Sequence, residues 1–189
     1  MKKTLLISII TVLLGTTAFC QEIEIGIKGG MNFTNLGSPD LGLQSRIGYH
    51  LGGTGEFILT PFFSIQTELV YSLQGAAIDR TQQIYLNYHY LNIPLLAKAY
   101  FYEDASFEIG VQYGYLLKSV NETYLGSQSD AINRNDFSVA FGLAYKLNDM
   151  INFGIRYNMG LTNTSDQNII YEKRFTNRVL QISLGYIFQ

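Results

Sequence analysis

Charge, cysteine and tryptophan are all scarce in this 189-residue sequence. Only 15% of its residues are charged, against about 25% in an average soluble domain. It has one cysteine, three prolines and no tryptophan, while 14% of its residues are aromatic. The formal net charge of −2 provides no basic surface to collect phosphates, which excludes nucleic acid as a partner. The aromatic content also excludes a disordered chain.

Long apolar runs are absent too, although 47% of the residues are apolar. A transmembrane helix needs about 20 consecutive apolar residues, and no such run occurs. The 18 glycines also argue against a helical membrane protein. These numbers leave one unusual class, a membrane protein with no long apolar run.

The first 20 residues have the pattern of an export signal. Lys2 and Lys3 precede an apolar stretch over 5–14, and Ala18-Phe19-Cys20 forms a cleavage site of the small-x-small kind. We therefore expect 1–20 to be a cleaved signal peptide and 21–189 to form the mature domain. Bulky Phe19 directly before Cys20 argues against a lipid anchor. Cleavage would remove the only cysteine, and with it disulfides and thiol chemistry.

Apolar and polar residues alternate with a period of two in eight segments, which predicts eight strands. Each segment has about 11 or 12 residues, close to the length that a tilted strand needs to cross a bilayer. The segments are 22–33, 48–59, 63–74, 90–101, 106–118, 136–147, 151–162 and 178–188.

The connections between these segments alternate in length. Four are long and polar (34–47, 75–89, 119–135 and 163–177), and three are short (60–62, 102–105 and 148–150). Long loops at one end and tight turns at the other are typical of outer-membrane barrels. The sequence therefore predicts an all-β fold, an eight-stranded antiparallel up-and-down transmembrane β-barrel, located in the outer membrane.

Alternation does not say which face points outward, because a soluble lipocalin-like barrel alternates as well. One face carries more aromatic bulk than the lumen of eight strands can hold, so we expect it to face lipid. The opposite face is rich in glycine, which suits a narrow interior. The aromatic face contains Tyr49, Phe57, Phe63, Tyr71, Phe107, Tyr113, Tyr115, Phe137, Phe141, Phe153, Tyr157, Tyr186 and Phe188.

Charged residues fall on the inward face, where four acids meet five bases. Buried charges are costly unless paired, so this near balance predicts a network of ion pairs across the lumen. A proton or ion path is the alternative, but an eight-stranded barrel is only wide enough for its own side chains. The predicted lumen network comprises Glu24, Lys28, Glu56, Glu68, Lys98, Glu108, Lys118, Lys146 and Arg156.

Three smaller features complete the prediction of a barrel. Pro94 cannot donate a ladder hydrogen bond, which predicts a bulge in its strand. The ending Gly185-Tyr186-Ile187-Phe188 resembles the signal read by the barrel-insertion machinery during biogenesis. Aromatic residues near the short turns predict an interfacial girdle. Its members are Phe62, Phe63, Tyr100, Phe101, Tyr102, Tyr145 and Phe188.

Catalytic and metal-binding patterns are not evident. The two histidines, His50 and His89, lie in no local motif that would bring a nucleophile, a base and an orienting group together. No cluster of His, Asp or Glu has metal-ligand spacing. We therefore expect no enzymatic activity, no metal and no cofactor.

Four segments resemble the PorT-like outer-membrane β-barrel family of Gram-negative bacteria. They are GIKGGMNFTNL (26–36), YLNIPLLAKAYF (90–101), FGIRYNMGLTN (153–163) and NRVLQISLGYIF (177–188). Asn92 stands where relatives often carry an acid. The resemblance implies a small outer-membrane barrel, in a family whose founding member is tied to protein secretion and gliding machinery.

Two functions remain open. In one, the barrel is a structural or interaction protein whose loops meet a partner in a surface or secretion assembly, through the contact candidates Tyr124, Tyr171, Lys173, Arg174 and Phe175. In the other, it is a narrow pore for small solutes or apolar molecules, with Lys98 and Arg156 setting selectivity. The expected surroundings in both cases are outer-membrane lipids.

Overall fold

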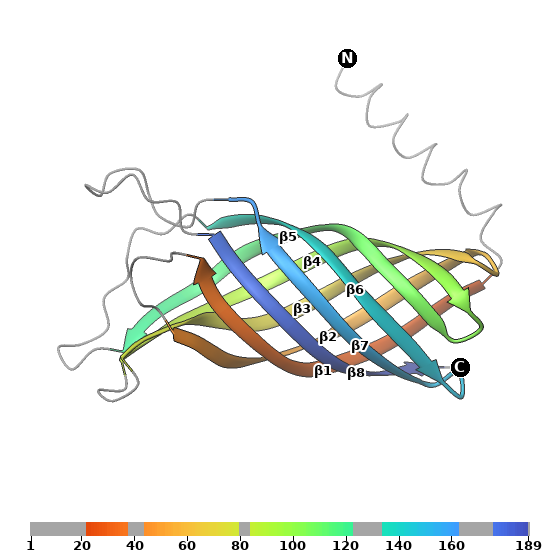
Figure 1. Ribbon diagram of the computed structural model, residues 1–189, viewed down its shortest axis with the longest axis horizontal. Helices are drawn as coiled ribbons and strands as arrows, with labels where there is room; N and C mark the ends of the chain where they lie inside the picture. The colour runs from red at the N-terminus through yellow and green to blue at the C-terminus, as the bar shows by residue number, and fades with distance from the viewer. Residues whose placement is uncertain (1–21, 38–43, 80–83, 123–133, 163–175, 189) are drawn as a thin grey trace, which may run out of the picture.

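The chain folds into a closed antiparallel barrel, seen in a computed structural model that describes residues 22–37, 44–79, 84–122, 134–162 and 176–188. Within these residues each strand pairs with its neighbours in sequence, and β1 closes the ring by pairing with β8 (Figure 1). The predicted fold is confirmed. The strands are β1 (Glu22–Gly37), β2 (Gln44–Thr60), β3 (Phe63–Asp79), β4 (Ile84–Tyr102), β5 (Ala105–Glu122), β6 (Asn135–Leu147), β7 (Ile151–Gly160) and β8 (Thr176–Phe188). In this part of the chain no helix combines the length and the apolar character needed to cross a membrane.

Most strands reach further toward the long loops than the alternation predicts. The alternation predicts loops where the structure has the loop-end parts of β2, β3, β4 and β5. These parts are 44–47, 75–79, 84–89 and 119–122. Their backbones continue the hydrogen-bonded ladder beyond the point where the apolar pattern stops, because pairing does not require a buried apolar face. The predicted signal peptide and all five loop contact candidates lie outside the described residues.

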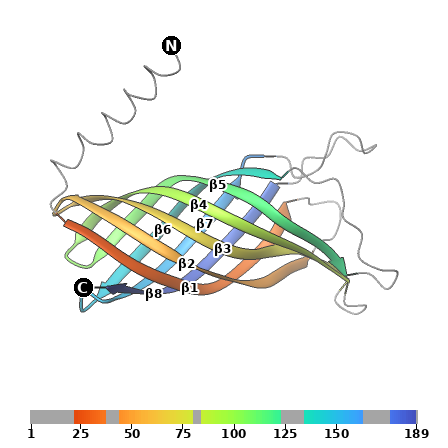
Figure 2. The ribbon, with the colours of Figure 1, turned by 180° about the vertical axis from the view of Figure 1, so that it is seen from behind.

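One end of the barrel, which we call the turn end, carries the tight turns after β2, β4 and β6. Both views show that β1 begins and β8 ends there, while β1 ends and β8 begins at the opposite end, which we call the loop end (Figures 1 and 2). Asn148 and Asp149 both have positive φ angles, 51° and 57°. Two such residues in succession form the type I′ turn that matches the twist of a hairpin. The predicted turns are thus confirmed.

The ladder at Pro94 differs from the prediction, because no bulge occurs there. On the β5 side Pro94 pairs with Gln112 in unbroken register. On the β3 side the register is the same on both flanks, and only the pairs opposite Glu68 and Leu69 are missing. The lost N–H of proline therefore interrupts two pairs without inserting a residue. Thr67 Oγ1 donates a hydrogen bond to Pro94 O at 3.3 Å.

The bulge in this region lies nearer the loop end, on β5. His89 of β4 pairs with Lys118, but the next residue, Tyr90, pairs with Leu116. Leu117 is therefore the extra residue, and an extra residue reverses the alternation beyond it. Lys118 is consequently exposed, which corrects its predicted place in the lumen.

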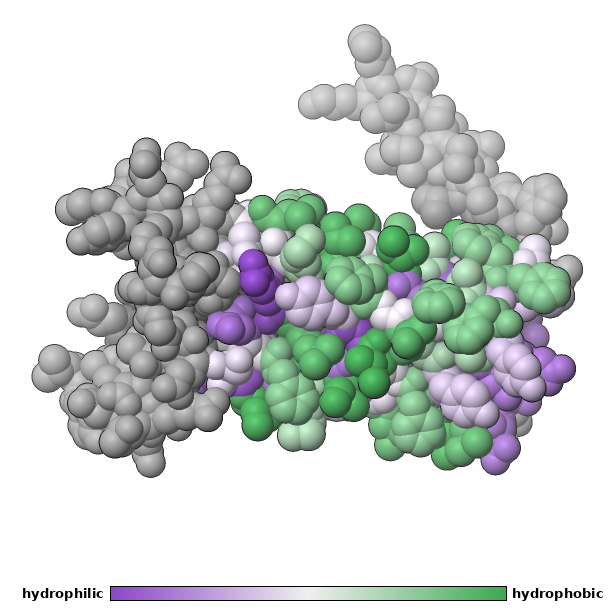
Figure 3. Space-filling model, in the orientation of Figure 1, coloured by the Kyte–Doolittle hydropathy of each residue, from purple (hydrophilic) through white to green (hydrophobic). Residues whose placement is uncertain are grey.

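The outward face is apolar over the middle of the barrel, as expected (Figure 3). Leu51 and Ile109 are 63% and 62% exposed. Exposure of such apolar side chains to water would cost free energy, but it suits a surface in contact with lipid. Of the predicted girdle, Phe62, Phe101 and Tyr102 are exposed at the turn end. Tyr100 is the exception, since its side chain is half-buried and bonds to Glu56 inside the lumen.

Candidate functional site

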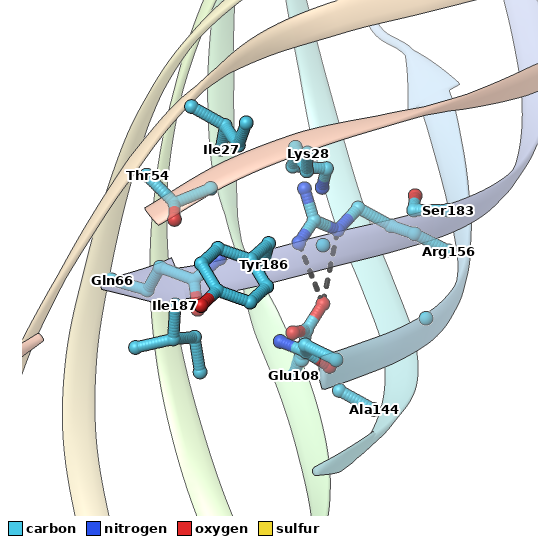
Figure 4. Close-up of a pocket in the computed structure, with 13 residues that line it drawn as sticks. Ile27, Lys28, Thr54, Gln66, Glu108, Ala144, Arg156, Ser183, Tyr186 and Ile187 are labelled. Carbon is cyan, nitrogen blue, oxygen red and sulfur yellow. Dashed lines mark hydrogen bonds and ion pairs between the residues drawn. The ribbon is translucent and has the colours of Figure 1, made fainter. Parts of the chain in front are cut away.

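The candidate site is the polar network that fills the lumen, and its centre is a four-residue ion cluster. Glu68 on β3 accepts two hydrogen bonds from Arg156 on β7, at 3.0 and 2.9 Å. Lys28 on β1 also donates to Glu68, at 3.1 and 3.2 Å. Arg156 donates in addition to Glu108 on β5, at 2.7 and 3.0 Å, as the dashed lines in Figure 4 mark. Four strands are therefore joined across the lumen by charge.

A second cluster lies beside the first and is joined to it by an amide. Lys98 Nζ donates to Glu56 Oε2 at 2.6 Å and to Gln66 Oε1 at 3.1 Å. Gln66 Nε2 in turn donates to Glu68 Oε1 at 2.5 Å. Glu56 also accepts from the hydroxyls of Ser64 and Tyr100. The network thus runs without a break from Lys98 to Arg156.

A third pair lies nearer the turn end, where Lys146 donates to both carboxylate oxygens of Glu24 at 2.7 and 2.8 Å. With Lys118 outside the lumen, the predicted network contains four acids and four bases, and every one of them has an opposite charge within hydrogen-bond distance. Such pairing is what allows charges to remain ionised where water is scarce. The eight residues are Glu24, Lys28, Glu56, Glu68, Lys98, Glu108, Lys146 and Arg156.

Toward the loop end the lumen network becomes mostly uncharged. Asn32 on β1 is its hub, because its amide nitrogen donates to Ser72 Oγ at 2.9 Å and its amide oxygen accepts from Gln181 Nε2 at 3.1 Å. Asn158 Nδ2 donates to Gln181 Oε1 at 2.9 Å. Neutral amides and hydroxyls therefore make up most of this half, in which Asp136 is also buried, and an amide can both donate and accept.

Three side chains of this half are linked in series by hydrogen bonds, an arrangement that no local sequence motif indicated. His50 Nδ1 lies 2.8 Å from Asn32 Oδ1, and His50 Nε2 lies 3.1 Å from Ser183 Oγ. The amide oxygen of Asn32 can only accept, so Nδ1 carries the ring proton and Nε2 accepts from the serine. The order matches a serine–histidine–asparagine catalytic set. Ser183 and His50 are separated by 133 residues, so the arrangement depends on barrel closure.

Ser183 borders two spaces of different size. One is an apolar groove of about 390 Å³, lined mainly by outward-facing side chains such as Leu143 and Phe153, and the other is a polar cavity in the lumen. The cavity that it lines with Lys28, Glu108 and Arg156 has a volume of about 30 Å³ (Figure 4). That volume holds about one or two water molecules, whereas sites for organic ligands are about 300 to 1,000 Å³. Side chains therefore fill the cross-section of the barrel.

Glycine allows this filling at the narrowest places. A Cβ atom at Gly30 would lie 2.0 Å from Ile182 O and 2.9 Å from His50 Cε1, distances at which no side chain fits. Among the described residues, no three His, Cys, Asp or Glu side chains are grouped as ligands for a metal ion.

Comparison with known proteins agrees with this architecture. A model of the outer membrane protein beta-barrel domain family matches residues 19–166. No curated protein matches the chain. Among solved structures, Ail, the attachment invasion locus protein of Yersinia pestis, is similar with a TM-score of 0.55 and 15% identity, over 89% of this chain and 100% of that one. Neisserial surface protein A is similar with a TM-score of 0.59 and 8% identity, over 88% and 97% of the two chains. At these identities the likeness shows the fold.

Proposed function

Because this chain belongs to the outer membrane protein beta-barrel domain family and is integral to the outer membrane, we propose that it is a structural or interaction protein whose plugged barrel anchors external loops. The observation that carries the proposal is the filled lumen. Eight paired charges and the mostly neutral loop-end half of the network occupy the lumen, and the cavity beside Arg156 has a volume of about 30 Å³. The part of the molecule left to meet partners is the set of connections at the loop end.

The partner belongs, in this proposal, to a surface or secretion assembly. Two observations support this choice without fixing the partner. Four segments resemble the PorT-like family, whose founding member is tied to secretion. They are 26–36, 90–101, 153–163 and 177–188. Ail and Neisserial surface protein A carry names that refer to attachment and to the cell surface, and they share this fold.

The experiment that tests the proposal is a crosslinked pull-down from intact outer membranes. The bait is the full chain, compared with a variant that lacks 124–132, a deletion that spares the ladder because β5 ends at Glu122 and β6 begins at Asn135. We expect the full chain to capture a defined outer-membrane or surface partner and the deletion variant to lose it. Equal capture by both would contradict a contact at Tyr124. A second deletion, of 165–174, tests Tyr171, Lys173 and Arg174 in the same way.

A serine hydrolase is not part of this proposal, although Ser183, His50 and Asn32 lie in the order of a catalytic set. Low exposure argues against it, since Ser183 is only 9% exposed; the spaces it borders are the lumen cavity of about 30 Å³ and the apolar groove of about 390 Å³. An alkyl fluorophosphonate probe tests it directly. We expect no labelling of the folded barrel, and labelling that disappears in Ser183→Ala but persists in Ser138→Ala would establish the enzyme instead.

A further inference from the structure

Asp136 on β6 is a buried acid of the lumen that has no cationic partner among the described residues. It is only 7% exposed, and it takes part in none of the ion pairs that fill the lumen. Each carboxylate of those pairs contacts a lysine or an arginine. A buried carboxylate without such a partner is costly, so Asp136 requires a proton or a cation from outside the chain.

Two side chains of β4 reach Asp136 because the residue between the strands is glycine. Asn92 on β4 pairs with Gly114 on β5, and Gly114 pairs with Asp136. A Cβ atom at Gly114 would lie 2.7 Å from Asn92 Oδ1 and 3.6 Å from Asp136 Cβ. It would also lie 3.5 Å from Cδ1 of Tyr90, whose hydroxyl interacts electrostatically with the Asp136 carboxylate. The three side chains therefore gather over the glycine.

Asn177 on β8 reaches the same carboxylate from the other side. Its side chain forms a hydrogen bond with Asp136, and its Nδ2 also donates to Gln74 Oε1 on β3. We call Tyr90, Asn92, Asp136 and Asn177 the Asp136 cluster. Its members come from β4, β6 and β8, so no spacing of residues along the sequence indicates them.

The Asp136 cluster contains polar atoms that are buried without a hydrogen-bond partner among the described residues. They are Tyr90 Oη, Asn92 Nδ2 and Asn177 Oδ1, and these residues are 1%, 2% and 4% exposed. A proton on Asp136 would supply one O–H and satisfy one acceptor. A metal cation contacts several oxygens at once, and the free N–H of Asn92 can donate to a water that completes the shell of the ion.

We propose that the Asp136 cluster binds a calcium ion. Carboxylate, amide and hydroxyl oxygens are ligands of hard cations, and Ca²⁺ accepts an irregular shell where Mg²⁺ demands a near-ideal octahedron. Since β6 begins at the loop end with Asn135 (Figure 1), the ion enters there without passing the ion pairs deeper in the lumen. A single carboxylate predicts weak affinity, with a dissociation constant on the order of 10⁻⁴ to 10⁻³ M. The inference does not depend on the loop partner proposed above.

Terbium luminescence of the folded full-length barrel in a zwitterionic detergent tests this inference. Tb³⁺ replaces Ca²⁺ at oxygen sites and emits when a nearby tyrosine is excited, and the chain has no tryptophan to interfere. We expect one saturable site from which Ca²⁺ displaces Tb³⁺. Asp136→Asn removes the only formal charge of the site and should weaken binding by about ten-fold or more. Tyr90→Phe keeps that charge, and should lower the emission at saturation.

Asp149→Asn is the matched control, because it removes an exposed acid at the turn end, where asparagine also suits the φ angle of 57°. We expect it to bind Tb³⁺ as the parent does, and heat-modifiable migration confirms that each variant is folded. The inference is overturned if Ca²⁺ does not displace Tb³⁺ from the parent, or if Mg²⁺ displaces it equally well. It is also overturned if Asp136→Asn binds as the parent does, if Asp149→Asn weakens binding as much, or if Tyr90→Phe leaves the emission unchanged.

Discussion

Arg156 is the residue on which the lumen cluster most depends, because it bonds to both Glu68 and Glu108. Arg156→Met would leave Glu108 without its cation and Glu68 with Lys28 alone. Removing one partner of a buried pair costs about 3 to 5 kcal/mol, and we expect a loss of that size in the free energy of unfolding. Urea titration followed by far-UV circular dichroism measures it, since the chain has no tryptophan for fluorescence.

Two controls make this prediction specific. Lys118→Gln removes an exposed charge and should change stability by less than about 0.5 kcal/mol. Glu108→Gln/Arg156→Met removes one carboxylate charge together with the guanidinium, and should recover part of the loss. A stability of Arg156→Met equal to that of the parent would show that the cluster contributes nothing to holding the barrel together.

Glycine positions give a second prediction at this scale. Gly30→Ala places a methyl group 2.0 Å from Ile182 O, so the strands β1 and β8 would have to move apart, at a cost of about 1 to 3 kcal/mol. Gly55→Ala is the matched control, because nothing lies within 4 Å of its Cβ position. We expect slower or incomplete folding into vesicles for Gly30→Ala only, measured by heat-modifiable migration. Equal folding of the Gly30→Ala and Gly55→Ala variants would mean that β1 and β8 are not packed closely at Gly30.

At the scale of strands and connections, the alternating pattern predicts which residues share a face but not where the alternation is reversed. Lys118 shows this limit, because a single extra residue at position 117 moves it from the lumen to the surface. Tyr100 shows a second limit, since an aromatic residue near a turn fits a girdle as well as a lumen hydrogen bond. Strand ends are also under-predicted, because backbone pairing continues where side chains become polar.

The connection between β5 and β6 provides the prediction for this scale. Asn121 and Glu122 pair with Leu86 and Tyr85, so a deletion that begins at 121 would remove ladder pairs, whereas deletion of 124–132 would not. We therefore expect the shorter deletion to unfold in urea within about 0.5 kcal/mol of the parent. Deletion of 119–132 should be less stable by more than 1 kcal/mol, and the reverse order would contradict the strand bounds.

At the scale of the whole molecule, the sequence predicts the closed barrel and the presence of a charged lumen, but it does not predict which lumen side chains bond to each other. The partners in the lumen are far apart in the chain, such as Lys146 with Glu24 and Ser183 with His50, which are 122 and 133 residues apart. Those contacts depend on the stagger of the strands around the ring. Alternation within one strand contains no information about that stagger.

Closure and filling together give a prediction about conductance. Planar-bilayer recordings of the purified barrel should show no stable open current, because the lumen is crossed by paired side chains from four strands. The variant Glu68→Ala/Arg156→Ala, which removes the centre of the cluster, should show brief openings that the parent lacks. A steady current through the parent at ordinary voltages would favour the pore function over the interaction function.

The pairing of β1 with β8 also makes barrel formation dependent on the complete set of strands. Thirteen residue pairs join the two strands, from Ile25 with Phe188 to Gly37 with Thr176. A chain that lacks β8 would leave an edge on β1 and another on β7, and unpaired backbone groups cannot be satisfied by lipid. Such a fragment would stay outside the bilayer, accessible to proteases. The joining of the first strand to the last therefore ensures that only chains translated to their final strand persist in the membrane.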